Sequence, residues 1–354
     1  MDIKIYSTRS EVVEASQGSF GDCSSQQPAW AWWDAIVSGL GHRPYYLLGI
    51  DSERKAFGCL PLMLVRSRLF GSFLVSLPYL NSGGLVFQGS TSIHEELCHS
   101  LIDRSVQLAD ELDVNHLELR HECRFEHPAF NYERTDKVHM RLALPSSPDE
   151  LMASFKSKLR SQVKKSNENL FEVRFSGQEL LADFYKVFAH NMRDLGTPVY
   201  SKNLFRETLR SFANSQGISK AELCVVRLNH QPISGALLVH HAHRTEVPSA
   251  SALRQFNPTN VNMWMYWQML QRAIEQGSVE FDFGRSTLGA GTYKFKEQWG
   301  AKPSPAVWQY YVRKGDPAQM RPDSSKNQRL VEIWKKLPVW LTRIIGPSIV
   351  RGIP

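Results

Sequence analysis

The sequence predicts an α+β protein made of two copies of one folding unit. Both halves of the 354-residue chain present the same order of elements, which is three strand-like runs, a loop, a long helix and one further strand. The chain is long enough for two domains with complete cores. We predict domains at residues 1–145 and 146–315, followed by a linker and a basic amphipathic tail at residues 316–354.

The first half begins with a helix near residues 28–40, whose apolar face ends at Gly41. Its tryptophans are expected to pack in the core or at a domain interface, and lining a ligand groove is the alternative. Strand-like runs, a loop, a second helix and a final strand follow at residues 45–50, 56–64, 72–78, 78–84, 93–112 and 115–120.

A helix between the halves is indicated by Ser147 as its N-cap, Pro148 in the first turn and Glu150 three residues on. Its apolar residues are spaced to face inward: Leu151, Phe155, Leu159 and Val163. Its basic residues gather on another face: Lys156, Arg160 and Lys164, with Lys158 and Lys165 nearby. Such a row of charges is either solvated or an anion site for a phosphorylated substrate.

The second half opens with a helical segment at residues 184–209, which a Gly-Thr-Pro sequence interrupts before Ser201 begins another helix. Three strands, a loop and a helix follow at residues 222–228, 232–241, 245–253, 254–259 and 260–276. This last helix is apolar almost all round, so we expect it to be buried between layers.

The segment at residues 278–300 has the features of an active-site edge. Phenylalanines alternate with acidic residues up to Asp282, as in a strand with one buried face. Gly284 allows a turn, Arg285 stands at the strand end, and a glycine-containing loop leads to a short helix. A tight connection with solvated lysines is the alternative. The short helix carries Tyr293, Lys294, Phe295, Lys296 and Trp299.

This segment resembles the C-terminal signature of the FemAB-like acyl and aminoacyl transferases, in particular the FemAB-related proteins associated with bacterial exopolysaccharide and exosortase systems. The basic helix at residues 156–165 and the Gly-Thr-Pro sequence before Tyr200 also match the family pattern. The resemblance covers about residues 20–315. The matching residues of the signature are Phe281 to Ser286, Tyr293, Phe295, Lys296, Trp299 and Gly300.

The resemblance implies two tandem GNAT-like domains and the transfer of an acyl or aminoacyl group to an amine of a cell-envelope or exopolysaccharide precursor. In such a reaction Lys296 would stabilise the developing oxyanion, and Asp282 would orient the amine or accept its proton if its pKa is raised. The residues expected to bind substrate are Arg285, Tyr293, Phe295, Asn81, Gly84, Arg160, Lys156, Arg193 and Tyr200.

The segment at residues 254–259 departs from the pattern of acetyl-CoA-dependent domains, because it lacks the glycines of their phosphate loop. The donor therefore stays open between acyl-CoA and aminoacyl-tRNA, neither of them a permanently bound cofactor. Two alternatives are a non-catalytic binding or assembly factor of a surface-polysaccharide system and a transferase of the peptidoglycan type that depends on aminoacyl-tRNA.

The cysteines and histidines indicate neither a disulfide framework nor a metal site. The five cysteines are scattered without a Cys-x-x-Cys pair, which favours reduced thiols in the cytosol. His240, His241 and His243 have no carboxylate or cysteine at ligand spacing. Because no apolar run has the length of a signal peptide or membrane span, we expect a cytoplasmic protein.

The tail carries most of the net charge. Residues 313–354 hold nine Lys or Arg against three Asp or Glu, which accounts for +6 of the net charge of +7. Trp334, Trp340 and several aliphatic residues alternate with these cations, and Pro338 and Pro347 are expected to break the segment into short pieces. It is predicted either to lie on an anionic membrane surface, which would place the protein at the inner face of the membrane, or to pack on the protein.

Overall fold

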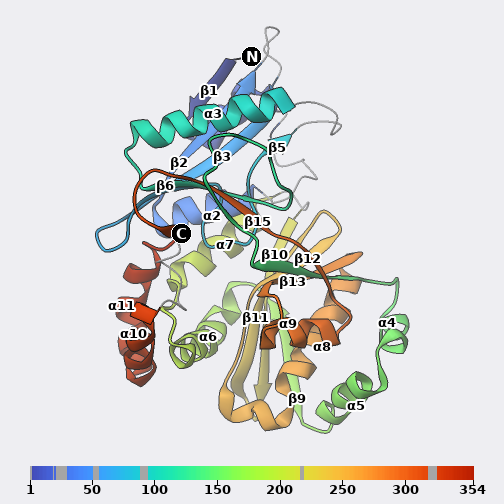
Figure 1. The fold of residues 1–354 in the computed structure, drawn as a ribbon. Coiled ribbons are helices and arrows are strands. Elements are labelled where there is room, and N and C mark those ends of the chain that lie inside the picture. Colours follow the sequence, from blue (N-terminus) through green and yellow to red (C-terminus); the bar gives the residue numbers. More distant parts are fainter. Residues whose placement is uncertain are drawn as a thin grey trace.

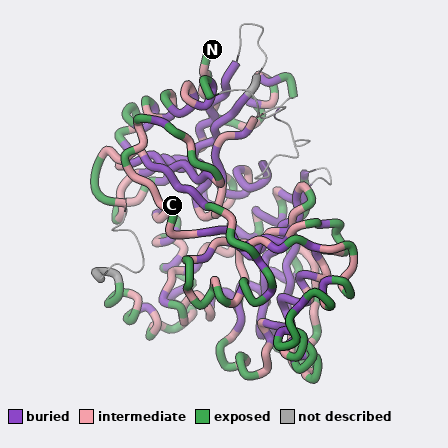
Figure 2. The backbone as a smooth tube through the Cα atoms, turned by 45° about the vertical axis from the view of Figure 1, so that its right-hand side comes forward, coloured by how far each residue is buried: buried purple, intermediate pink, exposed green. Residues whose placement is uncertain are grey.

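The structure, a computed structural model, describes residues 2–18, 20, 30–50, 56–87, 95–215, 219–317 and 325–354. It consists of two mixed sheets, one above the other in Figure 1, with helices packed against both. The strands form the buried interior, and the surrounding helices alternate buried and exposed residues (Figure 2). The predicted α+β class, with two similar units and a helical tail, is confirmed.

The first sheet has the strand order β1-β2-β3-β4-β6-β15-β7, with β5 beside β3. Only β4 and β6 pair in parallel among these described strands. The strands are β1 (Asp2–Tyr6), β2 (Arg43–Ile50), β3 (Ala56–Ser67), β4 (Gly71–Val75), β5 (Val86–Phe87), β6 (His116–His121), β7 (Tyr132–Arg134) and β15 (Val307–Val312). The helices of this part are α1 (Arg9–Ala15), α2 (Ala31–Leu40) and α3 (Glu95–Glu111).

The second sheet has the order β14-β8-β13-β12-β11-β10-β9, in which β12 and β13 are the parallel pair. Its strands are β8 (Lys137–Ala143), β9 (Phe171–Ser176), β10 (Ser219–Leu228), β11 (Gln231–His241), β12 (Arg244–Ala252), β13 (Glu280–Thr287) and β14 (Lys302–Pro305). Its helices are α4 (Pro148–Ser154), α5 (Ser157–Ser166), α6 (Leu181–Leu195), α7 (Lys202–Ala213), α8 (Val261–Glu275) and α9 (Gly291–Gln298), with 3-10 turns η1 (Gln178–Leu180) and η2 (Arg254–Thr259).

The two sheets repeat one plan. In each, three strands run antiparallel in sequence order, a long helix follows, and the next strand returns parallel to the third. A crossover helix is the connection that a parallel pair requires. The repeated element order seen in the sequence therefore corresponds to a repeated topology.

The sheets exchange strands at their parallel pairs. Strand β8 lies before residue 145 in the chain but pairs with β13 of the second sheet. In the opposite direction, β15 follows the second sheet in the chain but pairs with β6 of the first. The limits predicted at residues 145 and 315 therefore do not coincide with the limits of the two sheets. Each sheet contains one strand from the other half of the chain.

The helix predicted after Ser147 is two helices, α4 and α5, so that prediction was wrong in one respect. The chain is extended at Phe155 and Lys156. The ring of Phe155 packs edge-on against Trp267 and Trp299, with centroids 6.1 and 5.5 Å away. A continuous helix would require a helical backbone conformation at Phe155. The buried contacts of the Phe155 ring stabilise the extended conformation that separates α4 from α5. All four residues of the predicted inward face are buried.

The tail forms helices α10 (Ser325–Lys336) and α11 (Val339–Val350), which pack on α6. Arg193 donates from Nη1 to the carbonyl of Leu337 at 3.1 Å, and the Tyr79 hydroxyl donates to the carbonyl of Arg351 at 2.7 Å. The break at Pro338 is confirmed, whereas Pro347 lies inside α11. The part of the predicted linker at residues 318–324 lies outside the described residues.

Candidate active site

A pocket opens where the parallel strands β12 and β13 diverge. The two strands pair only at Arg244 with Glu280, Thr245 with Phe281 and Glu246 with Asp282. Beyond this point the strands are no longer paired, and the loop that follows β4 in the first half covers the opening. The lining residues come from both halves: Trp32, Leu80, Asn81, Ser82, His139, Glu246, Val247, Pro248, Asp282 and Gly284.

Asp282 is a buried carboxylate held in its ionised form. Its Oδ2 accepts a hydrogen bond from Arg141 Nε at 3.1 Å, and its Oδ1 accepts one from the Gly284 N–H at 2.7 Å. Burial alone would raise the pKa of Asp282, but nearby His139 and Arg141 outweigh it and lower the pKa to about 2. The condition that we placed on Asp282 as a proton acceptor is therefore not met, because its pKa is lowered.

Glu246 has the opposite electrostatic environment. Burial raises its pKa to about 7, and the negative charges of Asp282 and Glu122 act in the same direction, against Arg244 and Arg141. A carboxyl group with this pKa exists in both protonation states near neutral pH, which suits a general base. Glu246 is not among the site residues predicted from the sequence.

His139 completes the polar wall of the pocket. It is 1% exposed, and its Nδ1 lies 3.5 Å from Asp282 Oδ2. Within the described residues, its Nε2 has no hydrogen-bond partner. No group of three His, Cys, Asp or Glu side chains in the described chain, this site included, is placed to hold a metal ion.

Lys296 lies behind the pocket wall. Its Nζ donates to the carbonyls of Gly284 at 2.9 Å and Arg285 at 3.1 Å, and the residue is 8% exposed. Burial lowers the pKa of Lys296 to about 8, against the attraction of Asp282. Gly284 has φ +77°, and the register with β8 shifts between Asp282 and Arg285. Lys296 thus holds the backbone of a bulge beside the pocket and is not among the residues that line it.

Arg285, Tyr200, Asn81 and Gly84 gather at or near the junction of the two halves. Arg285 lies over the Trp308 ring, with Cζ 3.5 Å from the centroid. Burial raises the pKa of Tyr200, while the charges of Arg120 and Arg285 oppose this shift. Asn81 lines the pocket. Gly84 packs in the loop, where an added Cβ would lie 2.5 Å from His121 Cδ2.

The remaining predicted substrate residues lie elsewhere. Lys156 and Arg160 are exposed on α5, at the outer edge of the molecule in Figure 1, and Arg160 Nη1 donates to the Phe155 carbonyl at 2.6 Å. Arg193 binds Asp194 and the tail. Tyr293 and Phe295 pack against the core of the second sheet. Neither α5 nor these three residues belong to the pocket lining, and their role in binding substrate stays a prediction.

The connection η2 before α8 offers no phosphate-binding loop. The N–H groups of Phe256 and Asn260 donate to the carbonyls of Leu253 and Asn257, both at 3.0 Å. Pro258 has no N–H to offer. In the glycine-free sequence these two N–H groups are therefore bonded within the turn.

Comparisons with known proteins agree with this architecture. Residues 153–297 match the family model of the acetyltransferase (GNAT) domain. The structure of FemX is 14% identical and covers 95% of this chain and 100% of its own, with a TM-score of 0.63. The C-terminal domain of a candidate lysylphosphatidylglycerol synthetase from Agrobacterium fabrum is 10% identical, with coverages of 86% and 93% and a TM-score of 0.52.

A tandem GNAT protein from the clavulanic acid biosynthesis pathway is also 10% identical, with coverages of 89% and 100% and a TM-score of 0.50. No curated protein matches the chain in sequence. At these identities the structural matches establish the fold, which this chain shares with FemX and with the tandem GNAT protein. The family model adds that residues 153–297 are similar to an acetyltransferase (GNAT) domain.

Proposed function

We propose that this protein transfers an acyl or aminoacyl group to an amine in the pocket between its two halves, with Glu246 as the proton acceptor. The observation that carries the proposal is the pairing of Glu246, whose pKa is raised to about 7, with the ionised Asp282 in register on the next strand. An amine attacks a carbonyl only as the free base, so a carboxylate with this pKa has a defined role.

The chemistry assigns a different task to each side chain. Asp282 attracts the substrate ammonium and orients it, and Glu246 takes one proton from it. The free amine nitrogen then bonds to the donor carbonyl carbon, the bond between that carbon and the leaving group breaks, and the second proton lost by the nitrogen goes to the leaving group. His139 lines the pocket beside Asp282 and is placed to pass this proton between the two groups. Lys296 keeps the wall in place and adds positive charge near the developing oxyanion.

The donor that best fits these features is an aminoacyl-tRNA. Two N–H groups of turn η2 are bonded within the turn and Pro258 has none, which argues against a coenzyme A diphosphate there. The C-terminal end of α5 lies beside α8, because the indole of Trp264 on α8 donates to Asn167 Oδ1 at 3.0 Å. Helix α5 carries exposed lysines, which suit contact with the phosphates of a tRNA. The likeness to FemX and to a candidate lysylphosphatidylglycerol synthetase agrees with an aminoacyl donor.

The acceptor in this proposal is an amine of a cell-envelope or exopolysaccharide precursor. Mass spectrometry of surface glycans from a deletion strain should reveal the loss of an acyl or aminoacyl substituent. Wild-type protein should restore it, Glu246→Gln should not, and Glu172→Gln, at an exposed position on β9, should restore it fully. Unchanged glycans in the deletion strain would contradict the proposal.

The rival function is a binding or assembly factor that performs no chemistry. The same strains separate the two, because Glu246→Gln keeps the shape of the pocket and changes only its acid–base behaviour. Full restoration by this variant would favour the binding factor.

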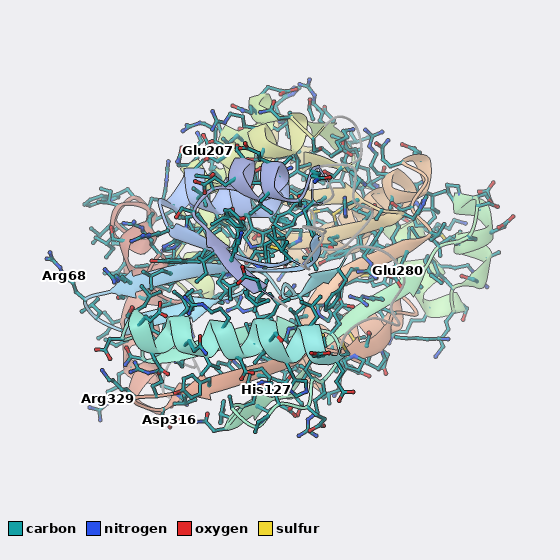
Figure 3. All side chains as sticks on the ribbon, turned by 90° about the horizontal axis from the view of Figure 1, so that it is seen from above. Arg68, His127, Glu207, Glu280, Asp316 and Arg329 are labelled. Carbon is teal, nitrogen blue, oxygen red and sulfur yellow. The ribbon has the colours of Figure 1, made fainter. Side chains whose placement is uncertain are left out.

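Membrane attachment through the tail is part of the proposal. The outer faces of α10 and α11 expose large apolar side chains among cations, and Arg329 lies at the outer edge of the molecule (Figure 3). None of the helices in the described ranges is long and apolar enough to cross a bilayer. A basic surface with exposed tryptophan and isoleucine suits contact with anionic lipid. The most exposed large apolar residues of α10 and α11 are Leu330, Ile333, Trp340 and Ile344.

A further inference from the structure

Three guanidinium groups gather around Trp308 beside the pocket. The Cζ atoms of Arg285, Arg120 and Arg134 lie 3.5, 4.0 and 5.4 Å from the centroid of its ring. The Trp308 indole donates to the carbonyl of Asn81 at 3.0 Å, and Asn81 lines the pocket. Because Arg120 and Trp308 belong to the first sheet and Arg285 to the second, the cluster exists only when both halves are in place.

The cluster contains three guanidinium groups, of which two are paired with a carboxylate. Glu118 accepts from Arg120 Nε at 2.6 Å, and Asp136 accepts from Arg134 Nε at 3.1 Å. Among the described residues, the guanidinium of Arg285 has neither a hydrogen bond nor a carboxylate partner. Burial and the neighbouring cations lower the pKa of Arg285 to about 9, so it is still a cation at neutral pH.

Arg120 supplies a second, independent sign of an unfilled site. It is 2% exposed, and its Nη1 donates to the carbonyls of Leu77 and Leu80 at 3.1 and 2.7 Å. Its Nη2 is buried and has no partner in the described chain. A buried donor left unpaired destabilises the folded protein, and a ligand oxygen bound to Arg120 Nη2 would remove this cost.

We infer that Arg120 Nη2 and the guanidinium of Arg285 form a subsite for an oxyanion, either phosphoryl or carboxylate, carried by a substrate of the transfer reaction. Planar guanidinium groups match such oxygens, and both groups lie against the ring of Trp308 beside the pocket. This inference rests on the proposed function and narrows it, because it requires one substrate to be anionic next to the reacting amine or carbonyl.

Binding can be measured without turnover. Isothermal titration calorimetry at low ionic strength would use UDP-glucosamine, coenzyme A and sodium acetate as probes. These probes stand for a nucleotide-linked acceptor, a thioester-carrying donor and a simple carboxylate. At least one should bind the wild-type protein, and the probe that binds identifies the source of the oxyanion.

Two variants of Arg285 test the site. Arg285→Gln should weaken binding about tenfold or more, whereas Arg285→Lys should retain part of it. Because the guanidinium of Arg285 makes no internal hydrogen bond, the melting temperature of both variant proteins should stay within about 2 °C of wild type. The matched control is Arg43→Gln, an exposed arginine whose Cζ lies 5.0 Å from the Tyr45 ring centroid. It should bind like wild type.

The inference is overturned if no probe binds the wild-type protein, or if Arg285→Gln binds as tightly as the control. It is also overturned if both Arg285 variants melt well below the control, because the contact with Trp308 would then be structural. Glu246→Gln protein should bind the probe normally. Intact binding combined with full glycan restoration by Glu246→Gln would refute the proposed chemistry and leave the subsite standing.

Discussion

Glu246 and Asp282 lie opposite each other on two parallel strands, yet the pKa of Glu246 is raised to about 7 while that of Asp282 is lowered to about 2. The difference arises because burial raises the pKa of Glu246 and the negative charge of Asp282 adds to this, whereas His139, Arg141 and the Gly284 N–H outweigh burial at Asp282. Two carboxyl groups with separated pKa values can divide the work of holding an ammonium and accepting its proton.

Glu246→Gln should lower kcat/KM about 100-fold to 10,000-fold, because the amide cannot accept the proton of the substrate amine. In the wild-type protein, kcat/KM should rise with pH up to an apparent pKa near 7, the value of Glu246. Steady-state kinetics between about pH 5 and 9 would check both. A variant that keeps the same rising limb would show that another group titrates.

Glu246 should also make folding stability depend on pH. Its pKa in the folded protein is about 7, above the ordinary value of 4.5 for a glutamate, so the unfolded chain releases this proton first as pH rises. The contribution of Glu246 is absent below pH 4.5, becomes destabilising as pH rises to 7, and then stays constant. Denaturant unfolding should find Glu246→Gln more stable than wild type at pH 8, by on the order of 2 kcal/mol, and equal at pH 4. Equal stability at both pH values would contradict this burial effect.

Lys296→Met should destabilise the protein by about 1–3 kcal/mol, because it leaves the carbonyls of Gly284 and Arg285 without their donor. Activity should fall as well, chiefly in kcat, since the bulge positions Asp282. Lys294→Met changes an exposed lysine on the same helix and should do neither. Unfolding curves and kinetics of both variants, with Lys296→Arg as a conservative replacement expected to restore part of the activity, would distinguish this positioning role from simple packing.

Charge reversal at Lys156, Arg160 and Lys164 should weaken the binding of charged tRNA strongly and flatten its dependence on salt concentration. These side chains are exposed on or beside α5. Reversing Lys186, Arg206 and Arg210 on α6 and α7 provides an equal change of charge at other exposed positions. Filter binding over a range of salt concentrations would make the comparison, and equal effects of the two triple variants would rule out a specific role for α5.

Trp340→Glu combined with Ile344→Glu should abolish flotation with anionic vesicles. These side chains are 64% and 66% exposed, so the change should not disturb packing. The matched double variant Leu69→Glu with Leu170→Glu alters residues that are 77% and 83% exposed outside the tail, and it should float like wild type. Vesicles of neutral lipid provide the second control. If all three proteins float equally, α11 is not the membrane contact.

Local patterns predicted the repeated elements, namely the strands β2, β3, β4, β6, β10, β11, β12 and β13 and the long helices, and the Ser147 N-cap is present. The strands β1, β5, β7, β8, β9, β14 and β15 were not predicted. The break at Phe155 was not predictable, because it depends on contacts with Trp267 and Trp299 far along the chain. The exchange of β8 and β15 depends likewise on pairings between distant segments, which periodicity does not report.

The site was predicted only in part, for the same physical reason. The signature segment led to Asp282 and Arg285, which lie at or beside the pocket. Glu246 was missed because its importance comes from its register with Asp282, and a single strand sequence gives no register. Recognising β12 and β13 as the parallel pair of the repeated unit would have placed the two acids together.

The reciprocal exchange of β8 and β15 has a consequence for how this chain can be divided. A fragment ending near residue 145 would carry β8 without its partner β13 and would leave β6 without β15. Unpaired strand edges of this kind promote aggregation. Expression of this protein should therefore keep both units in one polypeptide, so that β8 and β15 find the strands with which they pair.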